Sequence, residues 1–281
     1  MSYHLPPLHL IAVQVGLALA EDIGQADWTA MLIPEGRQGV ASVIVREEAV
    51  ICGQVWFDAC CQQVDPEISV KWCVAEGEKV APETLICELT GPARSLLTAE
   101  RSALNFLQTL SGVATEVRRY ADLVAHLPVK VMDTRKTLPG LRLAQKYAVR
   151  VGGGVNQRVG LYDGILIKEN HIMAAGSIAA AVKAAQELNA GVSIQVEVET
   201  LDELNEALAA GVKLILLDNM TLEQMKEAVR VTNGRAQLEA SGNATIDKLV
   251  RLAETGVDRI SIGALTKHVR ATDFSMRFQS K

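Results

Sequence analysis

The sequence predicts an α/β fold in two parts, a mixed α/β part up to about Gly112 and an α/β barrel after it. Two observations carry this prediction. Six short apolar runs alternate with amphipathic runs in the second part, which implies a parallel sheet with helices outside it. Each apolar run ends in charged, amide or glycine residues, as barrel strands that lead into an active site do, which favours a closed or nearly closed barrel.

The first part, residues 1–112, shows strand and helix signals in turn. Its opening apolar stretch predicts an amphipathic helix. The stretch is too short to cross a membrane, and it lacks the positively charged N-terminal region of a signal peptide. Alternating β-branched residues predict strands, and a turn signal separates two of them. The predicted elements are a helix at Leu8–Ala20, strands at Gly39–Arg46, Ile68–Val74 and Thr84–Leu89, and a helix at Thr98–Leu110.

The second part, residues 113–269, repeats a strand–helix unit, and we expect the tail at about 270–281 to pack back on the first part. Thr221 and Thr245 stand where helix N-caps belong. The predicted strands are Val129–Met132, Gly164–Ile167, Ile194–Val198, Leu214–Leu217, Ala236–Leu238 and Arg259–Ile262, and the predicted helices are Ser177–Leu188, Leu201–Ala210, Leu222–Val231 and Ile246–Glu254.

The charge pattern bears on the kind of partner. The chain has a net charge of -5, so nothing in it suggests a nucleic-acid partner. Six basic residues nevertheless fall in one short stretch, from Arg135 to Arg158. This cluster indicates either a small polyanionic ligand or a solvated basic helix face. The five cysteines lie in the first part without a Cys-x-x-Cys pair, which predicts reduced thiols in a cytoplasmic protein.

Polar residues at the predicted strand ends form the candidate site. Cationic side chains suit anions, since arginine grips a carboxylate in a two-pronged, planar way and lysine supplies a point charge. Glu197 and Asp218 end consecutive strands, so they can converge on Mg²⁺ or on ribose hydroxyls. Small residues before helix starts suit a phosphate. In chain order the strand ends are Asp133 to Lys136, Lys168 to His171, Glu197 with Glu199, Asp218 with Asn219, Ser241 to Asn243, and Gly263 with Ala264.

Several of these residues have a plain structural alternative. Either Glu197 or Glu199 could simply pair with Lys168, because alternation puts both on one face of the strand. The run Gly152 to Gly154 is either a loop that passes close to a ligand or a flexible turn. His171 and His268 are lone histidines, which are more often structural than catalytic.

The sequence then shows a family resemblance. The segments DTRKTLPGLRLAQKYAV from Asp133, GGGVNQR from Gly152 and GLYDGILIKENHI from Gly160 resemble the quinolinate phosphoribosyltransferases, also called nicotinate-nucleotide pyrophosphorylases. Four more segments match in order, so the resemblance covers nearly the whole chain: LTAERSALNFLQTLSGVAT from Leu97, LLDN from Leu216, EASGN from Glu239 and ISIGALTKHV from Ile260.

This resemblance implies a fold and a reaction. The fold is that of the type II phosphoribosyltransferases, an N-terminal α/β sandwich followed by a C-terminal α/β barrel. The reaction uses Mg²⁺ and joins quinolinate to phosphoribosyl pyrophosphate (PRPP), giving nicotinate mononucleotide, pyrophosphate and CO₂. The resemblance also implies a homodimer, the usual assembly of family members, which is sometimes paired into a dimer of dimers. In such enzymes the residue matching Arg101 reaches the partner's site.

The matching residues also receive roles from the resemblance. The family's quinolinate-binding cations fall on Arg101, Arg135, Arg158 and Lys168. Its phosphoribosyl and metal positions fall on Lys136, Glu197 and Asp218, which we take as the candidate catalytic residues, with the two carboxylates as candidate metal ligands. The other candidate substrate-binding residues are Thr134, Gln157, Ser241, Gly242, Asn243, Ile262, Gly263, Ala264 and His268.

One position departs from the family pattern. Family members usually read Asn-His-Arg where this chain has Asn156, Gln157 and Arg158. Glutamine keeps a hydrogen-bond donor but cannot become a cation. Two rival functions therefore stay open: phosphoribosylation of another anionic heterocycle, as expected of a related group associated with molybdate transport, and a non-catalytic protein that binds an anion.

Overall fold

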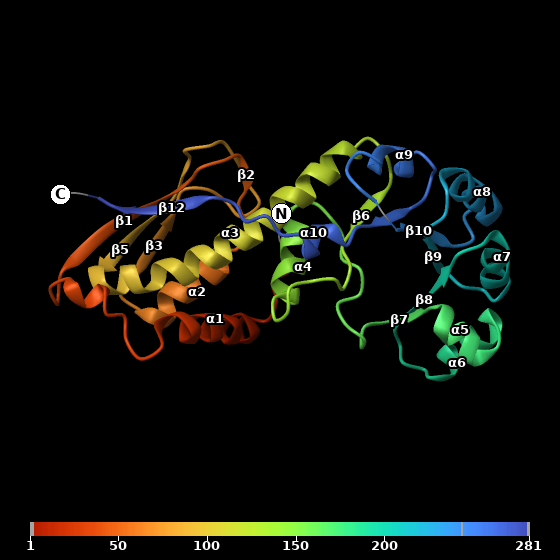
Figure 1. Ribbon diagram of the computed structural model, residues 1–281, viewed down its shortest axis with the longest axis horizontal. Coiled ribbons are helices and arrows are strands. Elements are labelled where there is room, and N and C mark those ends of the chain that lie inside the picture. Colours follow the sequence, from red (N-terminus) through yellow and green to blue (C-terminus); the bar gives the residue numbers. More distant parts are fainter. Residues whose placement is uncertain (1–2, 243, 280–281) are drawn as a thin grey trace. The chain divides into compact units, whose positions relative to one another are not determined.

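The computed structural model describes residues 3–242 and 244–279 of the 281-residue chain (Figure 1). It divides into two compact units, each of which is described by itself. The N-terminal unit contains residues 1–118, 138–153 and 267–281, and the barrel unit contains residues 119–137 and 154–266. The predicted boundary at Gly112 falls inside helix α3 (Ala93–Leu123).

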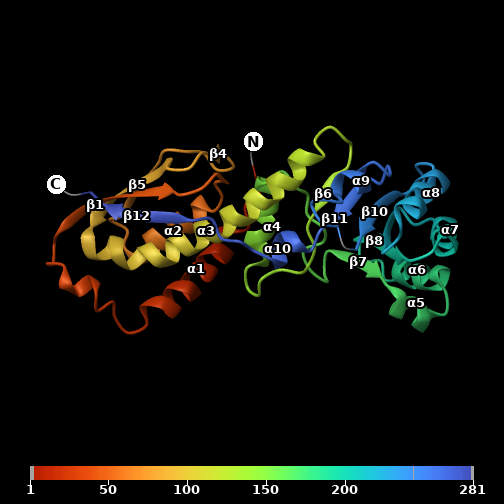
Figure 2. The same ribbon diagram turned by 45° about the horizontal axis from the view of Figure 1, so that its top comes forward.

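The N-terminal unit is built around a four-stranded antiparallel sheet in the order β12-β1-β5-β3. Strands β12, β1 and β5 of this sheet are labelled in Figure 2. Strand β12 comes from the end of the sequence and pairs Phe278 with Ala41 of β1. Helices α2 and α4 were not among the predicted elements. The unit's elements are α1 (Leu8–Ile23), a 3-10 helix (Ala30–Leu32), β1 (Gln38–Val45), β2 (Ala49–Val50), α2 (Gln54–Val64), β3 (Ser69–Trp72), β4 (Lys79–Val80), β5 (Leu85–Pro92), most of α3, α4 (Arg142–Val151) and β12 (Phe274–Phe278).

The cysteines belong largely to the core of this unit. Trp56 and Phe57 of α2 are fully buried, and Cys60 and Cys61 follow them one turn later. Burial raises the pKa of both thiols to about 12, so neither forms a reactive thiolate near neutral pH. All five cysteines are free thiols, and only Cys73 is exposed. None of the described helices is long and apolar enough to span a bilayer.

Helix α4 carries part of the basic cluster, and it corrects one alternative for that cluster. Lys146 is only 2 % exposed, and its neighbour Gln145 is fully buried. The Arg150 guanidinium donates a hydrogen bond to the carbonyl of His4. A solvated helix face does not describe these residues, because the helix packs its polar side chains into the unit.

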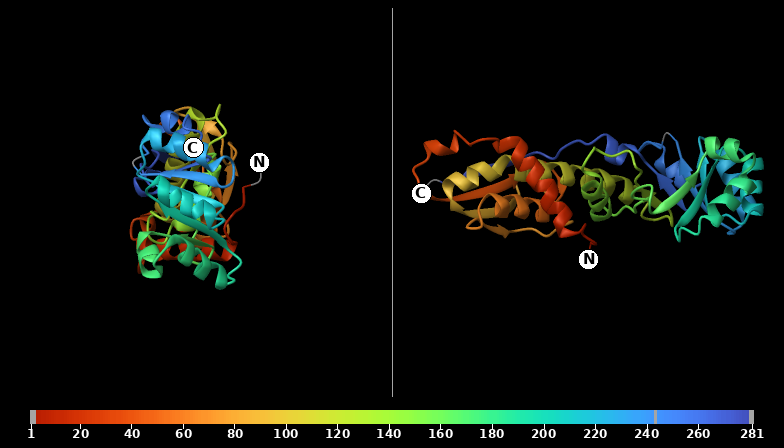
Figure 3. Two further views of the ribbon diagram at one scale, coloured as in Figure 1. Left: turned by 90° about the vertical axis from the view of Figure 1, so that its right-hand side faces the viewer. Right: turned by 90° about the horizontal axis from the view of Figure 1, so that it is seen from below.

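The barrel unit holds six parallel strands in the order β6-β11-β10-β9-β8-β7. Figure 3 shows strands and helices of this unit in green to blue. The unpaired side of β6 is extended by a parallel bridge between Met132 and Val155. No ladder joins β6 to β7 within the described residues, so the barrel is nearly closed rather than closed. The strands are β6 (Lys130–Met132), β7 (Gly164–Ile167), β8 (Ser193–Val198), β9 (Leu214–Asp218), β10 (Gln237–Ser241) and β11 (Arg259–Ser261).

Helices follow the strands as the sequence predicts. Thr221 accepts a hydrogen bond from the N–H of Gln224, so it is the N-cap expected there. The prediction for Thr245 was wrong: α9 begins at Leu249, because a turn joins the Thr245 carbonyl to the N–H of Lys248 first. The helices are α5 (Glu169–Ala175), α6 (Ile178–Glu187), α7 (Leu201–Ala209), α8 (Leu222–Thr232), α9 (Leu249–Ala253) and α10 (Ala264–Lys267).

Candidate active site

Strand alternation decides which side chains enter the barrel. On β8, Val196 and Val198 are fully buried, so Gln195 and Glu197 point to the opposite face of the sheet. Glu197 stands opposite Leu216 in the β8–β9 ladder, and Asp218 lies two residues further along the same face of β9. Successive strands therefore bring the two predicted carboxylates to one end of one face.

Lys168 and Glu197 form an ion pair at this end of the strands. Lys168 Nζ lies 2.6 Å from Glu197 Oε2. Glu199 is instead exposed, and its N–H donates to Glu203 at the start of α7. His171 accepts a hydrogen bond from the Lys168 N–H through Nδ1 and so caps α5. The structure thus separates Glu197 from Glu199 and gives His171 a structural task.

Asp218, Asn219 and Gly242 meet where β9 and β10 end. The Asn219 side chain donates to Asp218 Oδ2 over 2.8 Å, and its backbone N–H donates to the carbonyl of Ser241. Gly242 has a φ of +98°, and a Cβ there would lie 2.2 Å from Asn219 Oδ1. Only glycine fits this turn without displacing Asn219. The candidate residue Asn243 lies outside the described residues.

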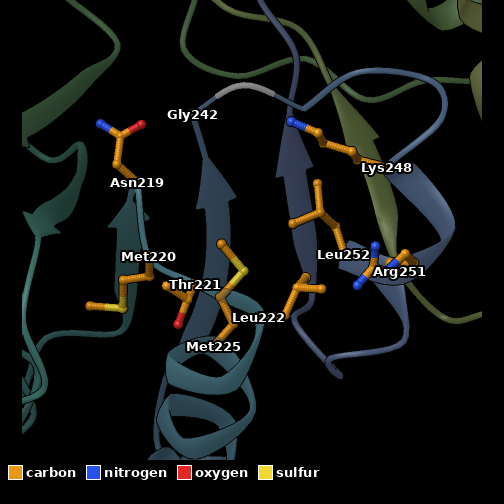
Figure 4. Close-up of a pocket in the computed structure, with 9 residues that line it drawn as sticks. All are labelled: Asn219, Met220, Thr221, Leu222, Met225, Gly242, Lys248, Arg251 and Leu252. Atoms are coloured by element: carbon orange, nitrogen blue, oxygen red, sulfur yellow. The ribbon is translucent and has the colours of Figure 1, made fainter.

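A cavity of about 380 Å³ lies beside this turn (Figure 4). Asn219, Thr221 and Gly242 line one part of it, and Lys248 and Arg251 lie across from them (Figure 4). Neither cation was a predicted site residue. Their spacing of three residues, shortly after the glycine turn, is the sequence signal that could have drawn attention to them.

Lys136 crosses over Gly263 at the ends of β6 and β11. A Cβ on Gly263 would lie 2.9 Å from Lys136 Cδ, so a side chain there would push the lysine away. The Lys136 N–H donates to Thr134 Oγ1, and the Lys136 carbonyl accepts from the Thr266 hydroxyl. The N–H of Ile262 donates to the Met132 carbonyl, and Ala264 begins α10. The predicted Thr134, Lys136 and Gly263 are therefore brought together.

Gln157 and Arg158 lie on the segment that follows Val155. Asp133, which is fully buried, accepts from the Asn156 side chain and from the Gln157 N–H. The Arg158 guanidinium donates to the carbonyl of Gly164 over 2.9 Å. Both residues line a cavity of about 270 Å³ whose other walls include the first residues of β7, β8, β9 and β11.

Arg158 shares its surroundings with a second guanidinium. Burial lowers the pKa of Arg158, the positive charge of Arg135 lowers it further, and Asp163 acts in the opposite direction. The Arg135 charge therefore lies near enough to disfavour a second cation at Arg158.

Three residues that the sequence analysis singled out lie in the N-terminal unit. Arg101, on an exposed position of α3, and His268, just after α10, belong to the N-terminal unit. Gly152 packs against α3, since a Cβ there would lie 2.5 Å from the carbonyl of Ala114. The glycine run therefore serves a close helix contact at Gly152, which neither of the two alternatives for it included.

The side chains that could bind a metal ion also bear on the kind of metal site that is present. No group of three or more His, Cys, Asp or Glu side chains able to hold a metal occurs in the part of the chain that the structure describes. Glu197 and Asp218 remain as a pair of carboxylates on neighbouring strands. Such a pair fits Mg²⁺, which typically takes one or two protein carboxylates and completes its shell with substrate phosphates and water.

Comparison with known proteins agrees with this fold. Two family models, the N-terminal and C-terminal domains of quinolinate phosphoribosyl transferase, match residues 27–111 and 113–277. A probable nicotinate-nucleotide pyrophosphorylase [carboxylating] from a Synechocystis strain is 41% identical and covers 97% of this chain and 94% of its own length. A protein of the same name from Bacillus subtilis is also 41% identical, over 91% of this chain and 89% of its own length.

A solved structure of a protein with the same name is also similar to this chain. The nicotinate-nucleotide pyrophosphorylase from Francisella tularensis superposes with a TM-score of 0.96 at 45% identity, covering 99% of both chains. The family models and these relatives span both units of the chain. The chain therefore belongs to the quinolinate phosphoribosyltransferase family.

Proposed function

We propose that this protein transfers the phosphoribosyl group of PRPP to quinolinate and removes CO₂, forming nicotinate mononucleotide and pyrophosphate in the synthesis of NAD. The observation that carries the proposal is the grouping of two lysines, two carboxylates and two glycine turns at the carboxyl ends of the barrel strands. Arg135 and Arg158 would supply positive charge for the acceptor's carboxylates. Family membership supports the same reaction.

Each group has a task in this reaction. Lys136 and the turns at Gly242 and Gly263 would hold the phosphates of PRPP. Glu197 and Asp218 would hold Mg²⁺ or the ribose hydroxyls; when bound, the metal supplies positive charge next to the departing pyrophosphate. In the structure, the Lys168 ammonium pairs with the Glu197 carboxylate and offsets its negative charge. Catalysis then consists of positioning and electrostatic stabilisation, with no obligatory acid–base residue in the transfer step.

Decarboxylation follows from the charge that transfer creates. The ring nitrogen attacks the ribose C1, the bond to pyrophosphate breaks, and the nitrogen becomes positively charged. That charge stabilises the carbanion that remains when the neighbouring carboxylate leaves as CO₂, and a proton then replaces the lost group. The protein's own contribution is to hold both carboxylates of the acceptor so that the nitrogen faces C1.

The proposal includes an assembly and a location. A homodimer would carry Arg101 from each subunit into its partner's site. The exposed apolar side chains of α1, Val13 at 58% and Leu17 at 69% exposure, support a partner-covered face on the N-terminal unit. The cytoplasmic location expected from the cysteines is part of the same proposal.

The test is an assay of the purified protein with quinolinate and PRPP. We expect equal amounts of nicotinate mononucleotide, pyrophosphate and CO₂ with Mg²⁺, and loss of all three products in EDTA. Nicotinate in place of quinolinate tests the rival acceptor class that Gln157 raises. Turnover of nicotinate without turnover of quinolinate would contradict the proposal, and binding of quinolinate without any product would favour a non-catalytic protein.

A further inference from the structure

Three polar side chains meet inside the barrel unit, away from the strand ends. Gln157 Nε2 donates to Gln195 Oε1 over 2.9 Å and to Glu239 Oε1 over 3.3 Å. Gln195 Nε2 donates to the other carboxylate oxygen of Glu239 over 2.9 Å. Glu239 is 1% exposed and Gln195 is 8% exposed, so the group is shielded from water.

This group also reaches the backbone of the segment that carries Arg158. The Arg158 N–H donates to Gln157 Oε1 over 2.9 Å. The Gln157 N–H in turn donates to Asp133 over 2.8 Å. Consecutive backbone amides are thus fixed, one by the buried Asp133 and the other by a side chain that β8 and β10 hold in place.

The chemistry of the group makes its orientation specific. A buried carboxylate is costly unless donors satisfy it, and both oxygens of Glu239 accept from amide groups. Each amide can meet this demand in one orientation only, since its nitrogen must face Glu239 or the neighbouring amide oxygen. The Gln157 oxygen is thereby turned toward the Arg158 N–H.

We propose that Gln195 and Glu239 are positioning residues that lock Gln157 and, through it, set the backbone at Arg158 so that its guanidinium can bind a carboxylate of the acceptor. This inference rests on the proposed function for the acceptor. It changes the expected task of Gln157 from contacting the substrate to holding the substrate-binding arginine.

The first test needs no turnover. Amide hydrogen exchange is measured at Arg158 in the wild type and in Glu239→Gln, which keeps the size of the side chain but removes its charge. We expect about tenfold faster exchange in the variant, the ratio that corresponds to one lost hydrogen bond. Unchanged exchange at Arg158 would overturn the proposal whether or not the protein acts on quinolinate.

The second test exchanges the two partners. Glu239→Gln and Gln157→Glu alone should each raise the KM for quinolinate about tenfold while the KM for PRPP stays at its wild-type value. The double variant Gln157→Glu/Glu239→Gln swaps carboxylate and amide, keeps the total charge and lets the donors pair again. We expect it to recover most of the lost affinity.

The control is Thr232→Val, a buried polar residue of α8 whose hydroxyl has no hydrogen-bond partner among the described residues. It should leave both KM values and the exchange at Arg158 unchanged. The proposal would be overturned if the KM for quinolinate rose further in the double variant than in either single variant. It would also be overturned if the KM for PRPP rose as much as the KM for quinolinate. A wild-type protein that makes no nicotinate mononucleotide would contradict the proposed function instead, and the exchange measurement would still decide the inference.

Discussion

Lys168 Nζ lies 2.6 Å from Glu197 Oε2, a contact between the residue that follows β7 and the next strand, β8. The lysine side chain is 48% exposed and the glutamate side chain is 15% exposed. An ion pair with one end in water adds little to stability, so the pair matters mainly for the charge that it presents at the site.

Lys168→Met is therefore expected to separate activity from stability. Removing the ammonium leaves the Glu197 carboxylate facing an anionic substrate, so kcat/KM for quinolinate should fall roughly 100-fold, as when one partner of a close charge pair is lost. The melting temperature should change little. Steady-state kinetics and thermal unfolding check this, and a large loss of stability with retained activity would contradict it.

Arg135→Ala should abolish quinolinate binding and keep the fold. The loss is expected to be roughly 100-fold or more in affinity, because a two-pronged charge-assisted contact disappears. Arg135→Lys is the matched control: it keeps the charge but not the planar fork, so an intermediate loss is expected. Calorimetric titration with quinolinate and circular dichroism measure the two effects. Wild-type turnover in Arg135→Ala would remove this residue from the site.

Gly242→Ala tests the turn beside Asp218 against a glycine of similar backbone conformation. Gly234 also has a positive φ, +73°, but no atom of the described residues lies within 4 Å of the position a Cβ would take there. Both alanine variants should lose roughly 1–2 kcal/mol in urea unfolding from the left-handed backbone. Only Gly242→Ala should also raise the KM for PRPP, because Asn219 must move off Asp218. Equal kinetics in the two variants would show that this turn does not bind phosphate.

Gln157→His introduces the residue that the family resemblance leads us to expect at this position. We expect turnover of quinolinate to be kept or increased, since an imidazole N–H can donate to Glu239 where the amide does now. The measurement is kcat and KM for quinolinate beside those for nicotinate. A collapse of kcat on quinolinate would show that the pocket is tuned to a different acceptor.

Mixing two inactive variants tests the role of Arg101 in a homodimer. Arg101→Ala and Arg135→Ala subunits should each be nearly inactive alone. A mixed dimer contains one site with both arginines if Arg101 acts in its partner's site, so random mixing should restore about a quarter of wild-type activity. Light scattering establishes the dimer, and the absence of any recovery would place Arg101 outside the partner's site.

The regular repeat of the barrel unit could be predicted because local patterns determine it. The predicted strand at Gly164–Ile167 matches β7 residue for residue, and the other five lie close to their observed positions. Helix α4 is not among the predicted elements because its basic residues indicate ligand binding as readily as a helix face, whereas Lys146 and Gln145 are buried. The hydrophobic periodicity of a sequence does not show whether a lysine side chain is buried.

The candidate site was predictable at the strand ends and less so within the barrel. Parallel strands bring their ends together whatever the exact register, so Glu197 and Asp218 could be named in advance. Gln195 lies on the same face as Glu197, and this alternation was a usable signal. The hydrogen bond between Gln195 and Glu239 depends on the register of the β8–β9 and β9–β10 ladders. No local pattern of residues specifies these registers.

The pairing of β12 with β1 sets an order for folding during synthesis. The whole sequence of the barrel unit is translated between these two strands, so the ribosome must complete it before the N-terminal sheet gains its fourth strand. Until then β1 presents an open edge to other nascent chains. A fragment that ends at Gly112 would keep that edge permanently and should aggregate, although it contains every other strand of its sheet.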